Sequence, residues 1–541
     1  MLSLLLLPLF LCCQDASDPA ATQQSPTVSQ SPEAMPTELG FLGVAAQDAI
    51  AYRVDMHVLS SGGFKGSIDY HFRAVEAIDS ILLDATTGDA WQMEFQNAAG
   101  EVLQVEQNEF AIRVPLKETA KPGTDIHFSM SFSGTPGDGL YRIRNRYGAT
   151  YLFTDHFACR ARGWMPCEDS NSDRAQFELT LHVPPGWDAV GCGAWQEVAP
   201  PDDAAPGKSF HGLSVSDIPP SLFAFAAGPF LRVVEDGDSR IQDHFVFPED
   251  MEKASLGLVH HAEWMITMEK VFGPYPYAKF TTVQIPTKWG GVEYPGNVWL
   301  AQTLFDRSDA GVSTLAHEFA HMWFGDGVGY SKWEDAWLSE GFASYFGPWL
   351  HAQVDGPKLA TIMRDNRTRW QRSKFAVKTP IRWKEYRRPN DFFSRVSANT
   401  YQKGSWVLHM LRQEIGDEAF FQGIQKFYQE NTGQAVETSS FVAAIEAAAD
   451  RDLDWFFTQW LDRPGAPELQ LEDQEGRLML TQTQEGELFR FKVRVAWTDA
   501  DGLPTEGVFE ISERETSLPL GANTRDWKLD PRVELLYIAS R

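Results

Sequence analysis

The chain has 541 residues, of which 43% are apolar and 22% are charged, a composition typical of folded soluble proteins. One compact core rarely extends over so long a chain, so about two to four domains are expected. The formal net charge of −27 argues against nucleic acid as a partner, because binding phosphates requires a basic surface.

The chain begins with an apolar run, MLSLLLLPLFLCC at residues 1–13, which is too short to span a bilayer and is typical of a signal-peptide core. Bacterial lipoproteins carry their lipid on a cysteine directly after such a run, so Cys12 or Cys13 is a candidate membrane anchor. The alternative is a cleaved signal peptide with incidental cysteines. Residues 14–39 have few large apolar side chains and are predicted to form a disordered tether. Either way, the protein is expected to be exported to the periplasm or cell envelope.

Residues 40–232 alternate apolar and polar side chains, with clusters of Gly, Pro and Asp between the alternating segments. Alternation with a period of two is typical of strands that bury one face. The pattern therefore predicts an antiparallel β domain. The clearest segments are YRVDMHV (52–58), GSIDYHFRAV (66–75), FAIRVPL (110–116), DIHFSMSF (125–132) and FELTLHV (177–183).

Three cysteines, Cys159, Cys167 and Cys192, fall in this β domain. Because their number is odd, they cannot all pair with one another, and an exported chain could form one disulfide among them. The sequence does not single out a pair.

Residues 233–465 change to a helical spacing of apolar residues, first at 251–272. Further helical segments are VSTLAHEFAHMWF (312–324), SWVLHMLRQEI (405–415) and SFVAAIEAAA (440–449). The last helix is expected to begin after Thr438, Ser439 and Ser440, which are good capping types. Residues 466–541 return to short alternating strands, so the chain reads as a β domain, a mainly helical domain and a small β domain.

Residues 364–388 carry ten Lys or Arg and two acids within a strongly acidic chain. A solvated face paired with acidic neighbours is the interpretation we prefer. The other interpretation is a basic wall of a cleft that attracts acidic substrates.

The helical part contains His317-Glu318-Phe319-Ala320-His321. Residues four apart lie on one face of a helix, so His317 and His321 can bind one metal ion, and Glu318 beside them can reach a water on that ion. Glu340 follows His321 by 19 positions in the apolar segment WLSEGFASY, where a second helix would bring it to the metal. Two imidazoles and a carboxylate with an open fourth position suit Zn²⁺.

Asp335, five residues before Glu340, has two interpretations. It could orient a metal ligand by a hydrogen bond, or it could be an acid at the start of a helix.

Several motifs together resemble the M1 family of zinc metallopeptidases, the group of aminopeptidase N and leukotriene A4 hydrolase. The metal motif has that family's spacing, with 18 residues between His321 and Glu340. The resemblance covers about residues 40 to 480. The other motifs are ARGWMPCEDSNSDRAQFELTLHVPPGWDAVGCG (161–193), VFGPYPYAKF (271–280), WGGVEYPG (289–296), TYQKGSWVLHML (400–411) and FFTQWLDRPGAPEL (456–469).

The resemblance implies an N-terminal antiparallel β saddle domain, a thermolysin-like, mainly α catalytic domain with a small sheet, and a short C-terminal β-sandwich. It also implies one zinc ion per chain, with the ion polarising the scissile carbonyl and activating a water. Glu318 is then the general base, and the Tyr401 hydroxyl is the donor to the oxyanion.

In the family, the loop matched by WGGVEYPG binds the free α-amine of the substrate through its glutamate, here Glu293, and lies on an edge strand. Gly290 and Gly291 match the glycines that let the backbone approach the substrate. Val292 and Tyr294 depart from the usual Met and Asn. The family also places a Gln or Glu in the β domain before the Ala-Arg of the cysteine signature, where this chain has Phe157, next to Asp155 and His156.

The sequence therefore predicts a zinc aminopeptidase acting on peptides. One alternative is a metallopeptidase of the same kind without strict N-terminal specificity. The other is a surface binding protein that has lost catalysis, which the presence of all five metal and catalytic residues argues against. The sequence gives no preference for the first substrate side chain.

Overall fold

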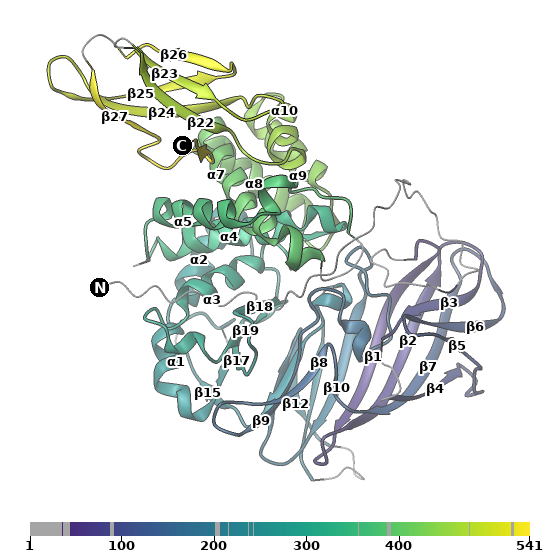
Figure 1. Ribbon diagram of the computed structural model, residues 1–541. Coiled ribbons are helices and arrows are strands. Elements are labelled where there is room, and N and C mark those ends of the chain that lie inside the picture. Colours follow the sequence, from purple (N-terminus) through teal and green to yellow (C-terminus); the bar gives the residue numbers. More distant parts are fainter. Residues whose placement is uncertain are drawn as a thin grey trace. The chain divides into compact units, whose positions relative to one another are not determined.

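The structure is a computed structural model (Figure 1). It describes Met35 and residues 44–86, 91–200, 206–214, 216–235, 237–241, 243–354, 356–386, 391–474, 477–520 and 524–540. The predicted signal segment, with Cys12 and Cys13, and the predicted tether lie outside these residues, apart from Met35. None of the helices in the described ranges is both long enough and apolar enough to cross a membrane.

The N-terminal part is built on a seven-stranded sheet. On β1, Tyr52, Val54 and Met56 are buried, whereas Arg53 and Asp55 between them reach solvent, which is the alternation that the sequence predicts. In spatial order, the strands are β12 (Ala194–Val198), β13 (Lys208–Leu213), β10 (Gln176–Val183), β1 (Gln47–Val58), β2 (Phe64–Ala74), β7 (Asp125–Gly134) and β4 (Trp91–Asn97).

Two smaller sheets complete the N-terminal part. The first has the order β11 (Asp188–Gly191), β14 (Phe225–Gly228), β9 (Thr150–Thr154) and β8 (Leu140–Arg144). The second has the order β3 (Ile78–Asp84), β6 (Ala111–Ala120) and β5 (Glu106–Gln107).

The prediction of a wholly antiparallel β domain is wrong for one central pair of strands. β1 and β10 run parallel, with Ala51 opposite Gln176 and His57 opposite His182. The two strands are far apart in the sequence and are not joined by a hairpin, so no tight turn forces them into opposite directions. Side-chain alternation indicates which face a strand buries, and it carries no information on direction.

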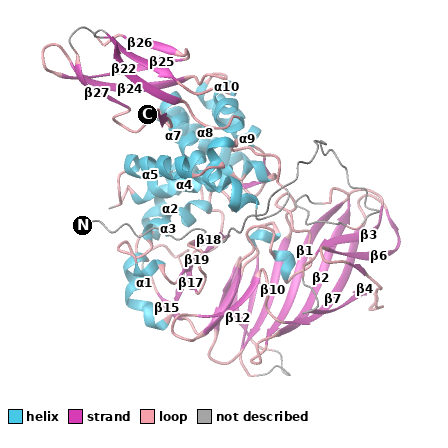
Figure 2. Cartoon of the chain, viewed as in Figure 1, coloured by secondary structure: helices cyan, strands magenta, loops and turns pink. Residues whose placement is uncertain are grey.

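The middle of the chain combines a five-stranded sheet with most of the helices, and Figure 2 shows strand-rich parts before and after it in the chain. The sheet has the order β15 (Leu231–Val233), β16 (His244–Val246), β17 (Thr281–Ile285), β19 (Asn297–Ala301) and β18 (Gly291–Tyr294). β18 is therefore an edge strand, paired antiparallel with β19 alone. A short parallel pair joins β20 (Gly329–Tyr330) to β21 (Ala435–Val436).

The helices of this part bury an extensive apolar core that includes Trp323, Trp337 and Trp406. They are α1 (Met251–Gly257), α2 (His261–Phe272), α3 (Val312–His321), α4 (Trp337–His351), α5 (Leu359–Arg372), α7 (Gly404–Ile415), α8 (Asp417–Asn431), α9 (Thr438–Ala449) and α10 (Asp454–Phe457). Three π-helical segments are Phe392–Val396, Asn399–Lys403 and Thr458–Asp462.

The predicted start of α9 is wrong. The helix begins at Thr438, so the three predicted capping residues lie inside it, and no side chain caps its N-terminus. The Thr438 hydroxyl donates instead to Oδ1 of Asp335 at 2.6 Å, a tertiary partner that competes with the local cap.

The C-terminal part consists of two small sheets. One has the order β26 (Glu515–Leu518), β23 (Arg477–Gln482), β22 (Glu468–Gln474) and β28 (Ile538–Ala539). The other has the order β25 (Pro504–Ile511), β24 (Phe491–Thr498) and β27 (Arg525–Leu529). The chain is thus a multidomain protein with a β-rich N-terminal domain, a helical central domain and C-terminal strands.

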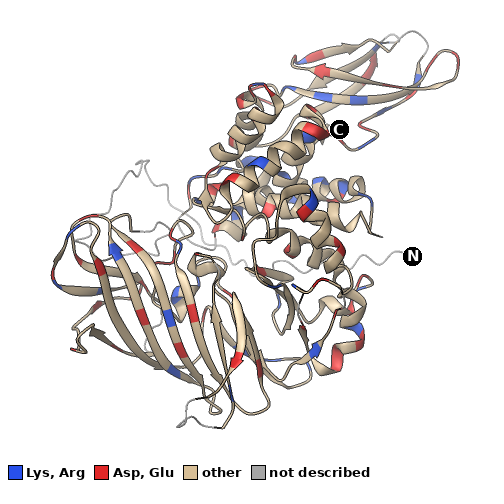
Figure 3. Cartoon of the chain, turned by 180° about the vertical axis from the view of Figure 1, so that it is seen from behind, with Lys and Arg blue, Asp and Glu red and all other residues tan. Residues whose placement is uncertain are grey.

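Basic side chains of the 364–388 segment pair with acids from other parts of the chain. Arg367 binds Asp530 at 3.1 Å, and Arg382 contacts Asp335 and Asp462, each at 3.2 Å. Figure 3 shows acidic and basic residues interspersed over the chain. Arg367 and Arg382 are thus paired with acidic neighbours, as the preferred interpretation of the segment expects of its basic residues.

The three cysteines of the N-terminal part, Cys159, Cys167 and Cys192, are buried free thiols. The disulfide that the sequence left open among them is therefore not formed.

Candidate functional site

Helix α3 carries both histidines of the motif at its C-terminal end. Its apolar side chains Leu315 and Phe319 are buried in the core, which fixes the rotation of the helix. His317 and His321, one turn apart, then face the same way, and their Nε2 atoms are 3.3 Å apart. The local sequence thus sets two imidazole nitrogens side by side on a rigid element.

Helix α4 packs on α3 and adds Glu340 as the third side chain. Its Oε2 atom lies 3.3 Å from Nε2 of His317 and 3.3 Å from Nε2 of His321. Three ligands at zinc bond lengths of about 2.0–2.1 Å and tetrahedral angles are separated by about 3.3–3.4 Å. The triangle of 3.3 Å edges therefore fits a tetrahedral zinc ion with its fourth position open.

The orientation of His321 is set by two groups that the sequence analysis missed. Its Nδ1 atom lies 3.0 Å from the carbonyl oxygen of Phe324 and 3.1 Å from Oγ of Ser339. A carbonyl oxygen can accept a hydrogen bond and cannot donate one, so Nδ1 carries a proton and Nε2 keeps its lone pair for a metal. Burial lowers the pKa of His317, and a hydrogen bond to the backbone of Ala343 opposes this shift.

Glu318 lies between the histidines and the edge strand β18. A Cβ atom built on Gly291 would be 2.4 Å from Oε1 of Glu318 and 2.7 Å from its Cδ atom. A side chain at 291 would therefore displace the Glu318 carboxylate. Burial raises the pKa of Glu318 well above its usual value, and the nearby charge of Glu293 adds to the rise.

Glu293 faces the same site because side chains alternate along β18. Val292 and Tyr294 are buried on one side of the strand, so Gly291 and Glu293 face the other. Oε1 of Glu293 lies 3.9 Å from Nδ1 of His321, and 13% of its side chain is exposed. Gly290 differs from Gly291, since a Cβ atom there would meet nothing closer than a Thr314 methyl at 3.9 Å.

Carboxylates dominate the electrostatics of the site. The pKa of Glu293 is raised to about 7, because burial, with a smaller contribution from the Glu340 charge, outweighs the opposing charge of His321. Burial alone would lower the pKa of His321, but Glu293 and Glu340 outweigh burial and raise it. The rise in the pKa of His321 has the sign expected of a negatively charged pocket that favours a cation.

Tyr401 comes to the site from the π-helical segment Asn399–Lys403. Its hydroxyl donates a hydrogen bond to Oε1 of Glu340 at 2.5 Å, and its ring lies parallel to that of His317, with 6.0 Å between centroids. Burial and the Glu340 charge raise the pKa of Tyr401 well above its usual value. The hydroxyl therefore stays protonated and can donate.

Phe157 belongs to an aromatic cluster that reaches this site. Its ring packs against Trp333, Phe392 and Phe393, and the Phe392 ring packs edge-on against Tyr401 at 6.3 Å between centroids. The position that holds an acid or amide in the resembling family is thus part of an apolar surface here.

The two polar neighbours of Phe157 are engaged elsewhere. Asp155 accepts a hydrogen bond from Arg160 at 2.6 Å. His156 lies with Nδ1 3.1 Å from the carbonyl oxygen of Pro220, and its Nε2 atom accepts a hydrogen bond from the Trp164 indole at 2.7 Å. Neither side chain replaces the missing polar group at Phe157.

Asp335 is buried directly before α4, and its Oδ1 atom accepts hydrogen bonds from Thr438 at 2.6 Å and from Arg382 at 3.2 Å. These bonds tie the start of α4 to the rest of the domain. They support the interpretation of Asp335 as a structural acid at a helix start.

Comparison with known proteins finds two domain models of one peptidase family in this chain. The model of the peptidase M1 N-terminal domain matches residues 49–190, and that of the peptidase family M1 domain matches residues 258–460. The chain belongs to peptidase family M1, whose members are zinc metallopeptidases.

Curated relatives carry aminopeptidase names. Aminopeptidase N of Streptomyces lividans is 26% identical over 71% of this chain and 44% of its own length. Leucine aminopeptidase 2 of Emericella nidulans is 25% identical over 59% of this chain and 53% of its own length. Leucyl aminopeptidase of Saccharolobus solfataricus is 23% identical over 78% of this chain and 54% of its own length. The chain spans about half the length of the curated relatives it matches.

Proposed function

We propose that the chain is a zinc aminopeptidase that removes the first residue of peptides. One observation carries the proposal: three further functional side chains lie around the triangle formed by His317, His321 and Glu340. They are Glu293, Glu318 and Tyr401. The names of the relatives point the same way. An inactive binding protein is disfavoured, because ligands, base and donor are all present and face one another.

In this proposal, His317, His321 and Glu340 would hold one zinc ion, and the ion would supply Lewis acidity towards the scissile carbonyl and acidify a water. Glu318, held against Gly291, accepts the proton of the attacking water and later delivers it to the leaving amine. Tyr401 exchanges its hydrogen bond to Glu340 for one to the oxyanion as charge develops there.

Glu293 gives the proposed reaction its end-specificity. A free α-ammonium is attracted to the negative pocket around Glu293, whereas a blocked terminus has no charge to place there. Because β18 is an edge strand, the peptide backbone can pair with it as an added strand. Such pairing would set the first peptide bond beside Glu318.

A second candidate is a metallopeptidase of the same family without strict N-terminal specificity. Phe157 favours it, because the β domain then contributes an apolar ring where a second polar partner for the amine is expected.

The proposal extends to location and to the finer fold. The apolar run at 1–13 and the polar stretch at 14–39 support an exported protein in the periplasm or cell envelope, tethered through Cys12 or Cys13 or released by cleavage. Within the family, the three parts are proposed to be a saddle, a thermolysin-like domain and a sandwich.

The test compares free and N-acetylated forms of one peptide library by mass spectrometry. Single residues should leave the free peptides and not the acetylated ones, and both a chelator and Glu318→Gln should abolish the release. Equal cleavage of acetylated peptides would favour the second candidate. A complete lack of chelator-sensitive cleavage would favour a binding protein.

A further inference from the structure

The solvent-facing side of the seven-stranded sheet is rich in histidine. It carries five of the thirteen histidines of the chain, at positions 57, 71, 127, 182 and 211. None of them belongs to the proposed peptidase site. Imidazole is among the side chains that proteins use most often to bind zinc and related ions, so clusters of these residues are candidate metal sites.

Two of these histidines meet across the parallel strand pair. The register of β1 and β10 sets His57 opposite His182, and the rings stack with centroids 4.0 Å apart and planes inclined by 18°. Asp55 lies two residues before His57 on β1 and therefore faces the same side. The parallel pairing, which the sequence did not predict, is what brings the three side chains together.

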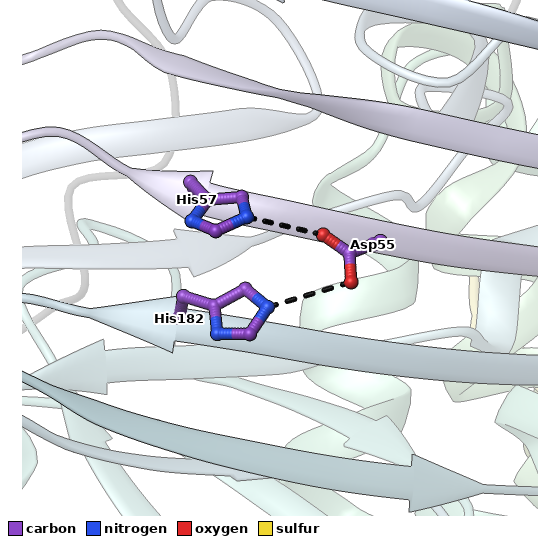
Figure 4. Close-up of side chains that lie close together, drawn as sticks. All are labelled: Asp55, His57 and His182. Carbon is purple, nitrogen blue, oxygen red and sulfur yellow. Dashed lines mark hydrogen bonds and ion pairs between the residues drawn. The ribbon is translucent and has the colours of Figure 1, made fainter. Parts of the chain in front are cut away.

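The carboxylate of Asp55 faces both rings (Figure 4). Its Oδ1 atom lies 3.3 Å from Nε2 of His57, and its Oδ2 atom lies 3.4 Å from Nε2 of His182. One ligand atom from each side chain lies within 4.8 Å of the other two. Oxygen-to-nitrogen separations of about 3.3–3.4 Å are those of two ligands on one tetrahedral zinc ion.

The surroundings of His182 allow the tautomer that a metal needs. Its Nδ1 atom lies 2.7 Å from Oγ of Ser209 on β13, and this oxygen can accept a proton from the ring. With the proton on Nδ1, the lone pair of Nε2 points to Asp55.

Access also suits an exchangeable ion. The exposed fractions of the side chains are 47% for Asp55, 33% for His57 and 9% for His182. His182 thus provides a buried, fixed ligand at the base, while the other two border solvent. Remaining coordination positions would be open to water.

A buried group of similar composition, Glu235, His244 and His261, does not have the histidine tautomer that a metal needs. Glu235, His244 and His261 also lie close together, but the backbone N–H of Thr282 donates to Nδ1 of His244 at 3.0 Å. Neutral His244 must then carry its proton on Nε2, the nitrogen that faces Glu235. A metal at that nitrogen would leave two donors facing each other, so this group is a hydrogen-bond network.

The other stacked histidine pair on the sheet face is also a poorer candidate. His71 and His127 stack at 4.2 Å between centroids, and Asp125 lies 3.3 Å from Nε2 of His71. However, Asp125 is also bound by Arg73 at 2.9 Å, and this fixed positive charge repels a cation. The pair therefore supplies matched control residues.

We propose that Asp55, His57 and His182 form a second divalent-metal site, of the zinc class, on the outer face of the N-terminal sheet. Two imidazoles and a carboxylate are the donor set that zinc prefers among abundant divalent ions, whereas Mg²⁺ and Ca²⁺ prefer oxygen. An ion there links β1 to β10 and stabilises the folded chain by linkage. The site acts independently of the proposed peptidase centre.

The experiment uses the full chain after treatment with a chelator, titrated with Zn²⁺ alone at pH 7.5 and followed by calorimetry and native mass spectrometry. The unsubstituted chain should bind two ions, and Asp55→Asn or His182→Gln should bind one. His127→Gln, on the same face, should still bind two. The proposal would be overturned if the unsubstituted chain bound only one ion. It would also be overturned if both Asp55→Asn and His182→Gln still bound two ions.

A second arm separates this site from the peptidase centre. The variant with both His317→Gln and His321→Gln should still bind one ion. Its melting temperature should still rise when Zn²⁺ is added. Adding Asp55→Asn to that background should remove both the ion and the rise, whereas adding His127→Gln should remove neither. Circular dichroism confirms that each variant is folded. A background that binds no Zn²⁺ would leave Asp55, His57 and His182 as a hydrogen-bonded surface cluster and refute the site.

Discussion

The hydroxyl of Tyr401 donates a hydrogen bond to the carboxylate oxygen of Glu340 that is turned away from the two histidines. One carboxylate thus joins the candidate metal ligands to the candidate oxyanion donor. The arrangement holds Tyr401 near the place where charge would develop and gives its hydroxyl a partner until substrate arrives. Removing the hydroxyl should therefore slow the reaction and also take away a hydrogen bond that orients the Glu340 carboxylate.

We expect Tyr401→Phe to lower kcat by about a hundredfold or more, the effect typical of losing one oxyanion donor. KM should change little, because the hydroxyl acts when charge develops. Steady-state kinetics on a free dipeptide amide measure both constants, and zinc content by mass spectrometry tests whether Glu340 still ligates. A fall in zinc content equal to the fall in kcat would show that Tyr401 acts through the metal ligand.

The neighbouring glycines of β18 make a matched pair for testing the position of Glu318. In Gly291→Ala, the new methyl would lie 2.4 Å from Oε1 of Glu318, so the carboxylate must move and kcat should fall at least about tenfold. In Gly290→Ala, the methyl makes an ordinary contact with Thr314 at 3.9 Å, and kcat should stay within about twofold. Equal losses in both variants would mean that the strand itself, and not Glu318, was disturbed.

The closeness of His317 and His321 could be predicted because its information is local. His317 and His321 are one helical turn apart, and the apolar positions of α3 determine which way that turn faces. The outward face of β1 was predictable for the same reason. Both features follow from the spacing of apolar residues along the chain, which repeats about every 3.6 residues in a helix and every two residues in a strand.

The features that the sequence missed depend on contacts between distant segments. The Phe324 carbonyl that orients His321 is a backbone atom, which any residue type supplies. Thr438 was mistaken for a cap because its hydroxyl has a better partner in Asp335, 103 positions away. The direction of β10 beside β1 depends on the path of the chain between them, to which side-chain alternation is blind.

Substituting Glu293 tests the amine-binding role. We expect Glu293→Gln to raise KM for free peptides and to lower kcat/KM by about 10- to 150-fold, the loss expected for one hydrogen bond to a charged group. Any slow cleavage of N-acetylated peptides should be unchanged, because they offer no ammonium. A loss of equal size for both kinds of peptide would place Glu293 in a structural role.

The aromatic cluster around Phe157 should favour substrates with a large apolar first residue. Phe393 connects Phe157 to Trp289, whose ring stacks on Phe393 at 6.2 Å between centroids and is 37% exposed. Phe393→Ala should lower kcat/KM for phenylalanyl peptides about tenfold relative to alanyl peptides, within the range for hydrophobic pocket contacts. Alanyl peptides are the internal control. An equal fall in kcat/KM for both kinds of peptide would show that the cluster does not determine specificity.

Buried neutral histidines should make the protein lose stability in mild acid. His156 is fully buried, with Nδ1 facing the Pro220 carbonyl and Nε2 accepting from Trp164, and burial lowers its pKa to about 3. The unfolded chain takes up this proton near pH 6.5, whereas the folded chain resists until about pH 3. Between these values the unfolded state binds more protons, so the free energy of unfolding falls as the pH falls.

The measurement is urea unfolding of the unsubstituted chain and of His156→Gln at pH 7.5, 6.5, 5.5 and 4.5. The substitution should lower stability at pH 7.5, because the hydrogen bonds to Pro220 and Trp164 are strained or lost, but it should flatten the decline towards pH 4.5. His409, whose pKa burial lowers to about 4, allows an independent check, since His409→Asn should also flatten the decline over the same range. The decline should persist in part in either variant, because the other histidine still titrates. Identical slopes in all three proteins would show that acid acts on other groups.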